Sequence, residues 1–374
     1  MSNRTGFPFS LRTTGTHRRS RQGFPSQQLQ ALWYGPGHPL VWLLSPLGWL
    51  YCAIAQARAA LWRRRWRQPP AAEDQIATPV IVVGNLTVGG TGKTPLVLWL
   101  AQHLRARGWR PGILTRGYGG QGSDQPRRVP VDGDPRDYGD EPVLLANRSG
   151  CPVMAGADRV AAARRLLQDC DCDLLLADDG LQHYRLRRDL EILLVDGRRG
   201  FGNRRCLPAG PLREPVSRAR RADILLTNGG SDDSRPNMAL RPQRAINLSD
   251  PRQTRALAQF VGTPVAAVAG IGNPEQFFAL LEYNGLRITR LPYPDHHAFS
   301  REDSKHWPAG PVLMTEKDAL KCRAFADLRH WYLPATAVPN QAFLQALEPQ
   351  LVALEQTHQR PSPHVSPKPP ESSA

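Results

Sequence analysis

The chain has 374 residues, a formal net charge of +15 and 41% hydrophobic residues. That length is enough for two domains with hydrophobic cores, and the scattered spacing of the six cysteines excludes a secreted disulfide scaffold. The positive charge predicts anionic partners. Because the basic residues are spread along the whole chain without zinc-finger or RNA-binding motifs, we expect lipid and phosphate partners, and neither a nucleic acid nor a protein partner.

The N-terminal part of the chain predicts a membrane-associated segment. Residues 1–32 are polar and basic, which is typical of a disordered tail. Residues 33–76 contain an apolar run at 40–55, interrupted by a proline and a glycine and followed by clustered arginines. This run is shorter than the ~20 residues that span a bilayer, and its tryptophans, tyrosines and flanking arginines favour a helix in the membrane interface. A buried core helix with a basic end and a true membrane span are the alternatives.

Residues 77–245 alternate short β-branched runs with helical segments, as buried parallel strands joined by helices do. Helical periodicity is clearest at residues 94–107 and 158–168. We therefore expect an α/β fold in which a P-loop NTPase-like, largely parallel sheet is flanked by helices. The expected strands are 80–83, 112–115, 152–155, 173–177, 191–195 and 223–227.

The alternation resumes after a polar stretch, and residues 246–356 predict a second, smaller α/β domain. Residues 357–374 are rich in proline and predict a disordered tail. The elements expected in the second domain are strands at 264–269, 287–291, 311–314 and 330–333 and a helix at 274–283.

The sharpest motif is GNLTVGGTGKT, residues 84–94, between an expected strand and an expected helix. A P-loop needs this context, because glycines let backbone N–H groups surround phosphates at a helix N-terminus. Lys93, which is the first of only five lysines in the chain, is expected to reach the β- and γ-phosphates, and Thr94 to bind Mg²⁺. Thr87 stands where the general motif has glycine, so the loop is expected to open differently. The predicted ATP-binding residues are Gly89, Gly90, Thr91, Gly92, Lys93 and Thr94.

A second motif, DLLLADDG at residues 173–180, is an apolar strand that ends in two carboxylates. Beside a P-loop, such a strand delivers a carboxylate to Mg²⁺, as a Walker B element does. We therefore predict Asp178 and Asp179 as metal ligands; an ordinary strand-to-turn transition is the alternative. Gln182 and His183 follow directly and are candidates for orienting phosphate or substrate.

Three further motifs are weak when taken singly. YGDEP, residues 138–142, places Asp140 and Glu141 at an expected helix start, where acidic residues usually cap the helix or complement its dipole. DHH, residues 295–297, lies in the second domain. TEKD, residues 315–318, follows a strand and by composition alone is consistent with a helix cap and solvated charges.

Taken in series, the motifs resemble those of the tetraacyldisaccharide 4'-kinases, the lipid A 4'-kinases of Gram-negative bacteria. GNLTVGGTGKTP, RGYGG, YGDEP, DDGLQHY, DHH and TEKD occur in the order and approximate spacing of that family. The resemblance extends from about residue 33 to about residue 334, and the Thr87 position agrees with the loop of this family.

The resemblance implies a membrane-associated enzyme at the cytoplasmic face of the inner membrane, whose anionic surface it contacts. Its reaction would transfer the γ-phosphate of ATP, with Mg²⁺, to the 4'-hydroxyl of an acylated glucosamine disaccharide 1-phosphate, forming lipid IVA. By similarity, Asp140 accepts the hydroxyl proton, His296 orients it, and Asp178 and Asp179 serve the metal. The candidate catalytic residues are Asp140, His296 and Lys93. The candidate substrate-binding residues are Tyr118, Glu141, Gln182, His183 and Arg213.

Two other classes of function remain compatible with the residues alone. A nucleotide-switch ATPase or GTPase of the P-loop class would hydrolyse nucleotide with water and would lack a sugar-binding second domain. A membrane-surface scaffold that binds nucleotide without turnover would need neither Asp140, Asp178 nor His296.

Overall fold

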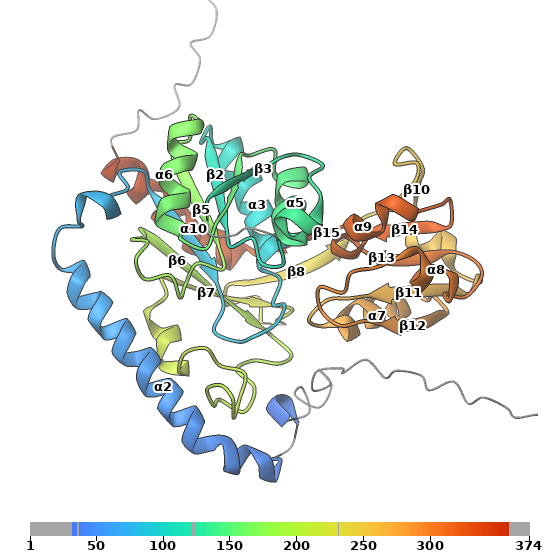
Figure 1. Cartoon of the computed structure of the whole chain (residues 1–374), viewed down its shortest axis with the longest axis horizontal. Coiled ribbons are helices and arrows are strands. Elements are labelled where there is room, and N and C mark those ends of the chain that lie inside the picture. The colour runs from blue at the N-terminus through green and yellow to red at the C-terminus, as the bar shows by residue number, and fades with distance from the viewer. Residues whose placement is uncertain (1–31, 36, 121–124, 231, 359–374) are drawn as a thin grey trace, which may run out of the picture.

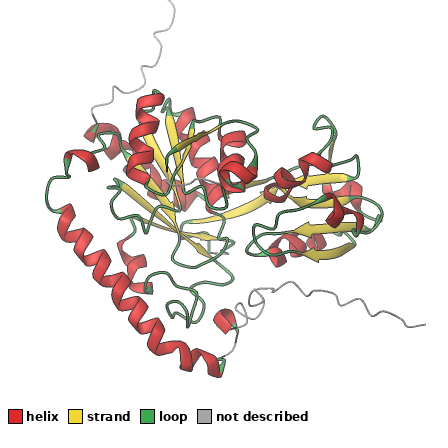
Figure 2. Cartoon of the chain, in the orientation of Figure 1, coloured by secondary structure: helices red, strands yellow, loops and turns green. Residues whose placement is uncertain are grey.

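The computed structural model describes residues 32–35, 37–120, 125–230 and 232–358. Nearly all of the two tails expected from the sequence, 1–32 and 357–374, lies outside these residues. The described part forms a larger domain around a nine-stranded sheet and a smaller domain around a six-stranded sheet (Figure 1). Helices cover both sheets (Figure 2), so the expected α/β class is confirmed.

The larger sheet has the order β15-β8-β7-β6-β1-β5-β2-β4-β3. The pairs from β8 through β1 to β4 are parallel, whereas β3 and β15 run antiparallel at the two edges. Its central strands are buried on both faces, which explains their continuous apolar sequences. The strands are β1 (Val80–Gly84), β2 (Pro111–Thr115), β3 (Arg127–Val129), β4 (Val153–Ala155), β5 (Leu174–Asp178), β6 (Leu190–Asp196), β7 (Ile224–Asn228), β8 (Asn237–Pro242) and β15 (Ala335–Pro339).

Helices pack on both faces of this sheet. Alternate β1 residues belong to different cores: Ile81 lies in the core that includes residues of α3, α5 and α10, and Val82 lies in the core that includes residues of α6. Asp158 caps α6 by accepting the N–H of Val160, and Asn340 caps α10 in the same way. The helices are α3 (Lys93–Ala106), α4 (Pro135–Tyr138), α5 (Asp140–Ser149), α6 (Arg159–Asp169) and α10 (Gln341–Thr357).

The smaller sheet has the order β10-β9-β14-β13-β11-β12, with parallel pairing among β11, β12, β13 and β14. The expected helix at 274–283 and the strand at 330–333 match residue for residue. The elements are β9 (Ala245–Asn247), β10 (Thr254–Arg255), β11 (Val265–Ala269), α7 (Pro274–Tyr283), β12 (Ile288–Pro292), α8 (Arg301–Lys305), β13 (Val312–Thr315), α9 (Glu316–Cys322) and β14 (His330–Leu333).

The smaller sheet ends earlier in the chain than the range 246–356 predicted. After β14 the chain returns to the larger domain, where β15 pairs antiparallel with β8 and α10 packs against β7, β8 and α3. Phe343 and Leu347 of α10 are fully buried in that core. Residues 335–356 therefore belong to the larger domain, and β8 and β15 form the two-stranded connection between the domains (Figure 1).

The apolar N-terminal run belongs to one continuous helix, α2 (Pro39–Trp66), which runs along the outside of the larger domain (Figure 1). The helix continues through the arginine cluster and has 28 residues, so the expectation that it is too short to span a bilayer is wrong. By length and composition it is the one helix among the described residues that is apolar enough to cross a membrane. Pro46 lies inside the helix without ending it.

Candidate functional site

The P-loop connects β1 to α3 and is held by two asparagine side chains. Asn85 donates from its amide to the Gly89 carbonyl (3.4 Å), and its carbonyl accepts from the Lys93 ammonium (3.2 Å). Asn228, at the end of β7, donates to the Thr91 carbonyl (2.9 Å). Gly92 has a φ of 93°, and a Cβ there would lie 2.7 Å from the Asn228 amide nitrogen, so glycine is required.

The segment before the glycines is bound to residues 211–213, which explains why Thr87 replaces glycine. The N–H of Arg213 donates to the Leu86 carbonyl (2.7 Å), and the N–H of Val88 donates to the Pro211 carbonyl (2.9 Å). Thr87 bridges to Leu212 in this short ladder and is buried. The loop is thus opened by pairing with another segment, and this pairing places Arg213 beside the P-loop.

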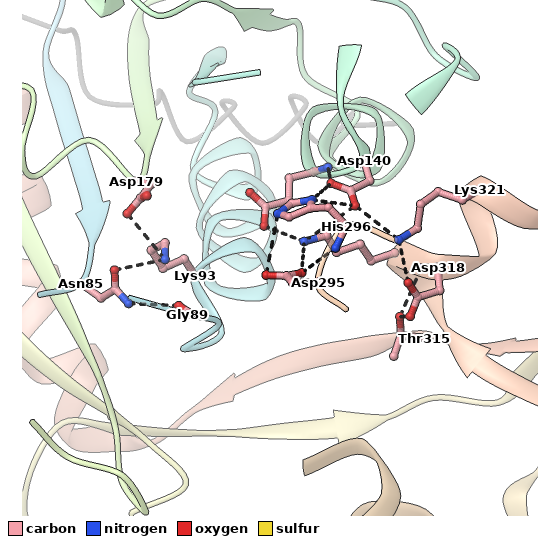
Figure 3. A network of polar contacts seen from close by, with 12 residues as sticks. Asn85, Gly89, Lys93, Asp140, Asp179, Asp295, His296, Thr315, Asp318 and Lys321 are labelled. Atoms are coloured by element: carbon pink, nitrogen blue, oxygen red, sulfur yellow. Dashed lines mark hydrogen bonds and ion pairs between the residues drawn. The ribbon is translucent and has the colours of Figure 1, made fainter. Parts of the chain in front are cut away.

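Asp178 ends β5, beside β1, and Asp179 follows it, so both lie at the edge of the sheet that carries the P-loop (Figure 3 shows Asp179 facing Lys93). One Lys93–Asp179 contact is 3.6 Å, and Arg213 donates to the other Asp179 oxygen at 2.9 Å. Burial opposes ionisation of Asp179, but Lys93 and Arg213 outweigh it and lower its pKa to about 2.

Asp178 has a different environment from its neighbour. Its side chain is buried and, unlike Asp179, takes part in no ion pair among those of the described residues; its Oδ1, like that of Asp179, has no hydrogen-bond partner there. Burial, and next the nearby charge of Glu141, raise the pKa of Asp178 to about 7. A buried carboxylate oxygen without a partner, next to a P-loop, fits a hard cation such as Mg²⁺.

Gln182 and His183 separate in the structure. Gln182 donates to the Asn85 carbonyl (3.2 Å) and accepts from Arg213 (3.4 Å), so it belongs to the P-loop cluster. His183 lies 3.9 Å from Asp158 and has its pKa lowered to about 4 by burial and by the positive charge of Arg159. His183 is therefore neutral at physiological pH, so its ring nitrogens can form hydrogen bonds but carry no positive charge.

Asp140 and His296 meet across the two domains (Figure 3). The His296 Nδ1 lies 3.1 Å from both carboxylate oxygens of Asp140, although 156 positions separate the two residues. Asp140 begins α5 and is 5% exposed. Burial opposes its ionisation, but the hydrogen bond from His296 and the charge of Lys317 lower its pKa, and the same hydrogen bond raises the pKa of His296.

The local backbone holds this pair in place. Gly139 has a φ of 89°, and a Cβ there would lie 2.4 Å from the Tyr118 carbonyl, so the RGYGG segment packs closely on the start of α5. Tyr118 consequently lies over His296, with ring centroids 5.0 Å apart. His296 has a φ of 59°, as Asp179 has one of 51°, and such left-handed residues concentrate at functional sites.

The smaller domain also reaches the P-loop. A Cβ on Gly272, in the loop from β11 to α7, would lie 3.0 Å from the Gly90 nitrogen and 3.3 Å from an Asp295 oxygen. Asn273 accepts a 2.6 Å hydrogen bond from Arg199 of the larger domain. The Asp140–His296 pair and the P-loop therefore line the same interdomain gap.

The TEKD segment contributes more than its composition indicated. Thr315 does cap α9, as its hydroxyl accepts the N–H of Asp318 (3.2 Å), but Asp318 is fully buried and Lys317 is 14% exposed. Lys317 and Lys321 lie 3.8 and 3.7 Å from Asp140. Both lysines were missed as site residues, and the scarcity of lysine in the chain was the available signal.

Comparisons with known proteins identify the family of the chain. The family model described as tetraacyldisaccharide-1-P 4'-kinase matches residues 40–352. A tetraacyldisaccharide 4'-kinase from Nitrosococcus oceani is 50% identical over 304 residues, which are 81% of this chain and 88% of that protein. One from Pseudomonas fluorescens is 47% identical over 332 residues, 88% of this chain and 97% of that protein.

A solved structure is similar as well. The crystal structure of "apo" form LpxK from Aquifex aeolicus in complex with ATP is 28% identical, has a TM-score of 0.68, and covers 84% of this chain and 99% of its own. The likeness therefore includes both domains of the described chain, and the resemblance drawn from the sequence motifs is confirmed.

Proposed function

Because the chain belongs to the tetraacyldisaccharide-1-P 4'-kinase family, we propose that its reacting groups are those which meet in the interdomain gap. The enzyme transfers the γ-phosphate of ATP to the 4'-hydroxyl of a tetraacylated glucosamine disaccharide 1-phosphate and so forms lipid IVA. The observation that carries this assignment of residues is the 3.1 Å contact of Asp140 with His296 beside a P-loop. A hydroxyl acceptor needs a positioned base, and this buried carboxylate is suited to that role.

Phosphoryl transfer requires alignment of the nucleophile and neutralisation of charge. The P-loop amides and Lys93 bind the phosphates, with the Lys93 ammonium oriented by its contacts with Asn85 and Asp179. Asp140 accepts the proton of the 4'-hydroxyl while His296 fixes the orientation of the carboxylate. Tyr118, whose ring is tilted by 55° against that of His296, offers an aromatic face to the sugar ring, and Arg213 and Gln182 bind phosphate oxygens.

Mg²⁺ is the metal that this site fits. Asp178, with its buried oxygen lacking a partner, and the Thr94 hydroxyl would hold it, and the bound ion would neutralise charge on the phosphates. Asp179 is engaged by Lys93 and Arg213, so we assign it to orienting these cations and Asp178 to the metal. No cluster of three or more His, Cys, Asp or Glu side chains suited to a metal occurs among the described residues.

Replacement of Asp178 by asparagine should raise the Mg²⁺ concentration for half-maximal activity by about 10-fold or more, because an anionic ligand is lost. Asp179→Asn should lower kcat with a smaller change in Mg²⁺ dependence. Magnesium titrations of the kinase rate distinguish the two, with the exposed Asp171→Asn as the matched control. An unchanged titration in Asp178→Asn would remove this residue from the metal site.

We also assign membrane attachment, at the cytoplasmic face of the inner membrane, to the exposed side of α2. Ser45 and Gly48 face the protein: Ser45 accepts from Arg205 (2.6 Å), and a Cβ on Gly48 would lie 3.0 Å from the Cys206 carbonyl. Trp42 and Leu43, by contrast, are 70% and 74% exposed. An outward apolar face with tryptophans, ending in arginines, suits a helix that enters the lipid from one side while staying bound to its domain.

Changing Leu43, Leu47 and Leu50 together to glutamine should weaken binding to anionic lipid vesicles by about 1,000-fold or more, since each leucine buried in lipid contributes about 1.5 kcal/mol or more. Vesicle sedimentation measures this, and ATP turnover with a detergent-dispersed acceptor should be retained. Leu328→Gln, an equally exposed leucine in the smaller domain, is the control. Undiminished vesicle binding by the triple variant would place the attachment elsewhere.

One experiment tests the reaction itself: transfer of radiolabel from γ-labelled ATP to a purified acylated disaccharide 1-phosphate. We expect label in the lipid, and little in the unacylated sugar. Phosphate release without any acceptor would instead support a nucleotide switch. Tight ATP binding without turnover would support a scaffold, and either result would overturn the proposed reaction.

A further inference from the structure

Helix α9 of the smaller domain lies along α5 of the larger domain, with ion pairs toward both ends of α5. At the C-terminal end, Arg148 contacts Glu316 at 2.5 Å. At the N-terminal end, where Asp140 stands, the Lys317 ammonium donates to Glu141 at 3.1 Å. The two ion pairs thus tie the same pair of helices, but only one of them adjoins the proposed base.

Two lysines of α9 approach Asp140, and their environments differ. Lys321 lies 3.7 Å from Asp140 but only 2.8 Å from Asp318, which belongs to its own helix and is fully buried (Figure 3). Asp318 in turn accepts from the N–H of Gly270 (2.9 Å). Lys321 is therefore neutralised mainly inside the smaller domain.

Lys317 instead stands between carboxylates of both domains. Its ammonium lies 3.1 Å from Glu141 and 3.8 Å from Asp140 of the larger domain, and 3.4 Å from Asp295 of the smaller one. Burial disfavours the ammonium, but Glu141, Asp140 and Asp295 together raise the pKa of Lys317, so it stays charged. Without this charge, three carboxylates would face one another across the gap.

Resting on the proposed role of Asp140 as the base, we propose that Lys317 is a positioning residue for the phosphoryl transfer. Its ammonium joins Asp140 and Glu141 of the larger domain to Asp295 of the smaller domain. It thereby keeps the Asp140 carboxylate within hydrogen-bond distance of His296. Lys317 itself contacts neither the P-loop residues nor Asp178 among the ion pairs of the described residues. It acts on the reaction through Asp140.

A loss of the ammonium has a distinctive consequence for pH dependence. Asp140 must be ionised to accept a proton, so activity falls as the pH drops through its pKa. An opposite charge within about 4–6 Å lowers a carboxyl pKa by about 1 unit or more, so removing Lys317 should move this acid limb upward. The charged groups that face Asp140 are His296, Lys317 and Lys321, with Glu141 next to it in the chain and Asp295 across Lys317.

The test compares Lys317→Met with Lys317→Arg and with Arg148→Met, which breaks the ion pair at the other end of α5. In Lys317→Met we expect kcat to fall by about 10-fold or more, because a misplaced base costs rate steeply, and the acid limb of the kcat–pH profile to rise by about 1 unit. Lys317→Arg should restore the acid limb and most of kcat. Arg148→Met should leave the acid limb where it is in the unmodified enzyme.

Thermal unfolding and ATP binding establish that each variant is folded. If Lys317→Met does not fold, the charge-balanced variant Lys317→Met/Asp295→Asn takes its place, with the same upward shift expected. An unshifted acid limb in the folded variant, or one that shifts equally in Arg148→Met, would overturn the inference. Asp140→Ala distinguishes failure of the two proposals. If Asp140→Ala is active, Asp140 is not the base. If Asp140→Ala is inactive but Lys317→Met is unaffected, Asp140 remains the base and only the role of Lys317 is refuted.

Discussion

Replacing Lys93 with alanine should lower kcat by about 100-fold to 1,000-fold, because it removes a positive charge aimed at the phosphoryl group where negative charge is shared in the transition state. Thr94→Ala should lower kcat by a similar factor through loss of a Mg²⁺ ligand. Both losses concern kcat more than ATP affinity, since the backbone N–H groups of the P-loop remain.

The measurement is the initial rate of lipid phosphorylation at saturating ATP and Mg²⁺, together with ATP binding by calorimetry. Lys305→Ala is the matched control, because Lys305 is exposed on α8 and pairs only with Glu302 among the described residues. A Lys93→Ala enzyme with near-normal turnover would contradict the assignment of the phosphate site. The contact of Lys93 with Asp179 adds a second expectation: Asp179→Asn should partly share the defect, since the lysine loses its partner.

The parallel core was predictable because its strands are short, continuous and apolar. β1 is buried at every position, and an uninterrupted run of apolar residues is typical of a strand that helices cover on both faces. The P-loop followed from its place between such a strand and a helix. No element was predicted after residue 333, and packing partners that lie far apart in the chain leave no local signal of which sheet a segment joins. For this reason the return of β15 and α10 to the larger domain was not foreseen.

The length of α2 was underestimated for a physical reason. Hydropathy marks where the apolar residues end, near residue 55, but arginine has a high helix propensity, so the helix continues to Trp66. Trp66 then anchors this end, donating from its ring nitrogen to the Tyr184 carbonyl at 2.8 Å. Composition thus gave the character of the segment, and the contact of its far end with the larger domain decided its extent.

The two halves of the site differ in what the sequence could provide. Asp178 and Asp179 were predictable from strand and P-loop alone. The pairing of Asp140 with His296 came from the family resemblance, since no spacing rule joins residues on different domains. Lys317 was overlooked because a lysine after a cap usually points to solvent, and only the approach of α9 to α5 makes it internal.

Asp140→Ala and His296→Ala should each lower kcat strongly, by about 100-fold to 10,000-fold for the base. The two groups form one unit, with His296 3.1 Å from both oxygens of Asp140, so the histidine has little to orient once the carboxylate is gone. The double variant should therefore be little worse than the poorer single variant. ATP affinity should be nearly unchanged, since neither side chain forms a hydrogen bond with the P-loop within the described part of the chain.

The measurement is the rate of the unmodified enzyme, the two single variants and the double variant at several pH values, which completes a double-mutant cycle. The lowered pKa of Asp140 places the acid limb of the unmodified enzyme below the ordinary range of a buried carboxyl, so activity is lost only as the pH falls through that value. His296→Ala removes the hydrogen bond that lowers this pKa most, and the acid limb should move upward. His297→Ala is the control, because His297 contacts Asp303 at 3.5 Å instead of Asp140. If the two factors by which kcat falls in the single variants multiply in the double variant, the two residues act independently. The Asp140–His296 contact would then serve only to hold the two domains together.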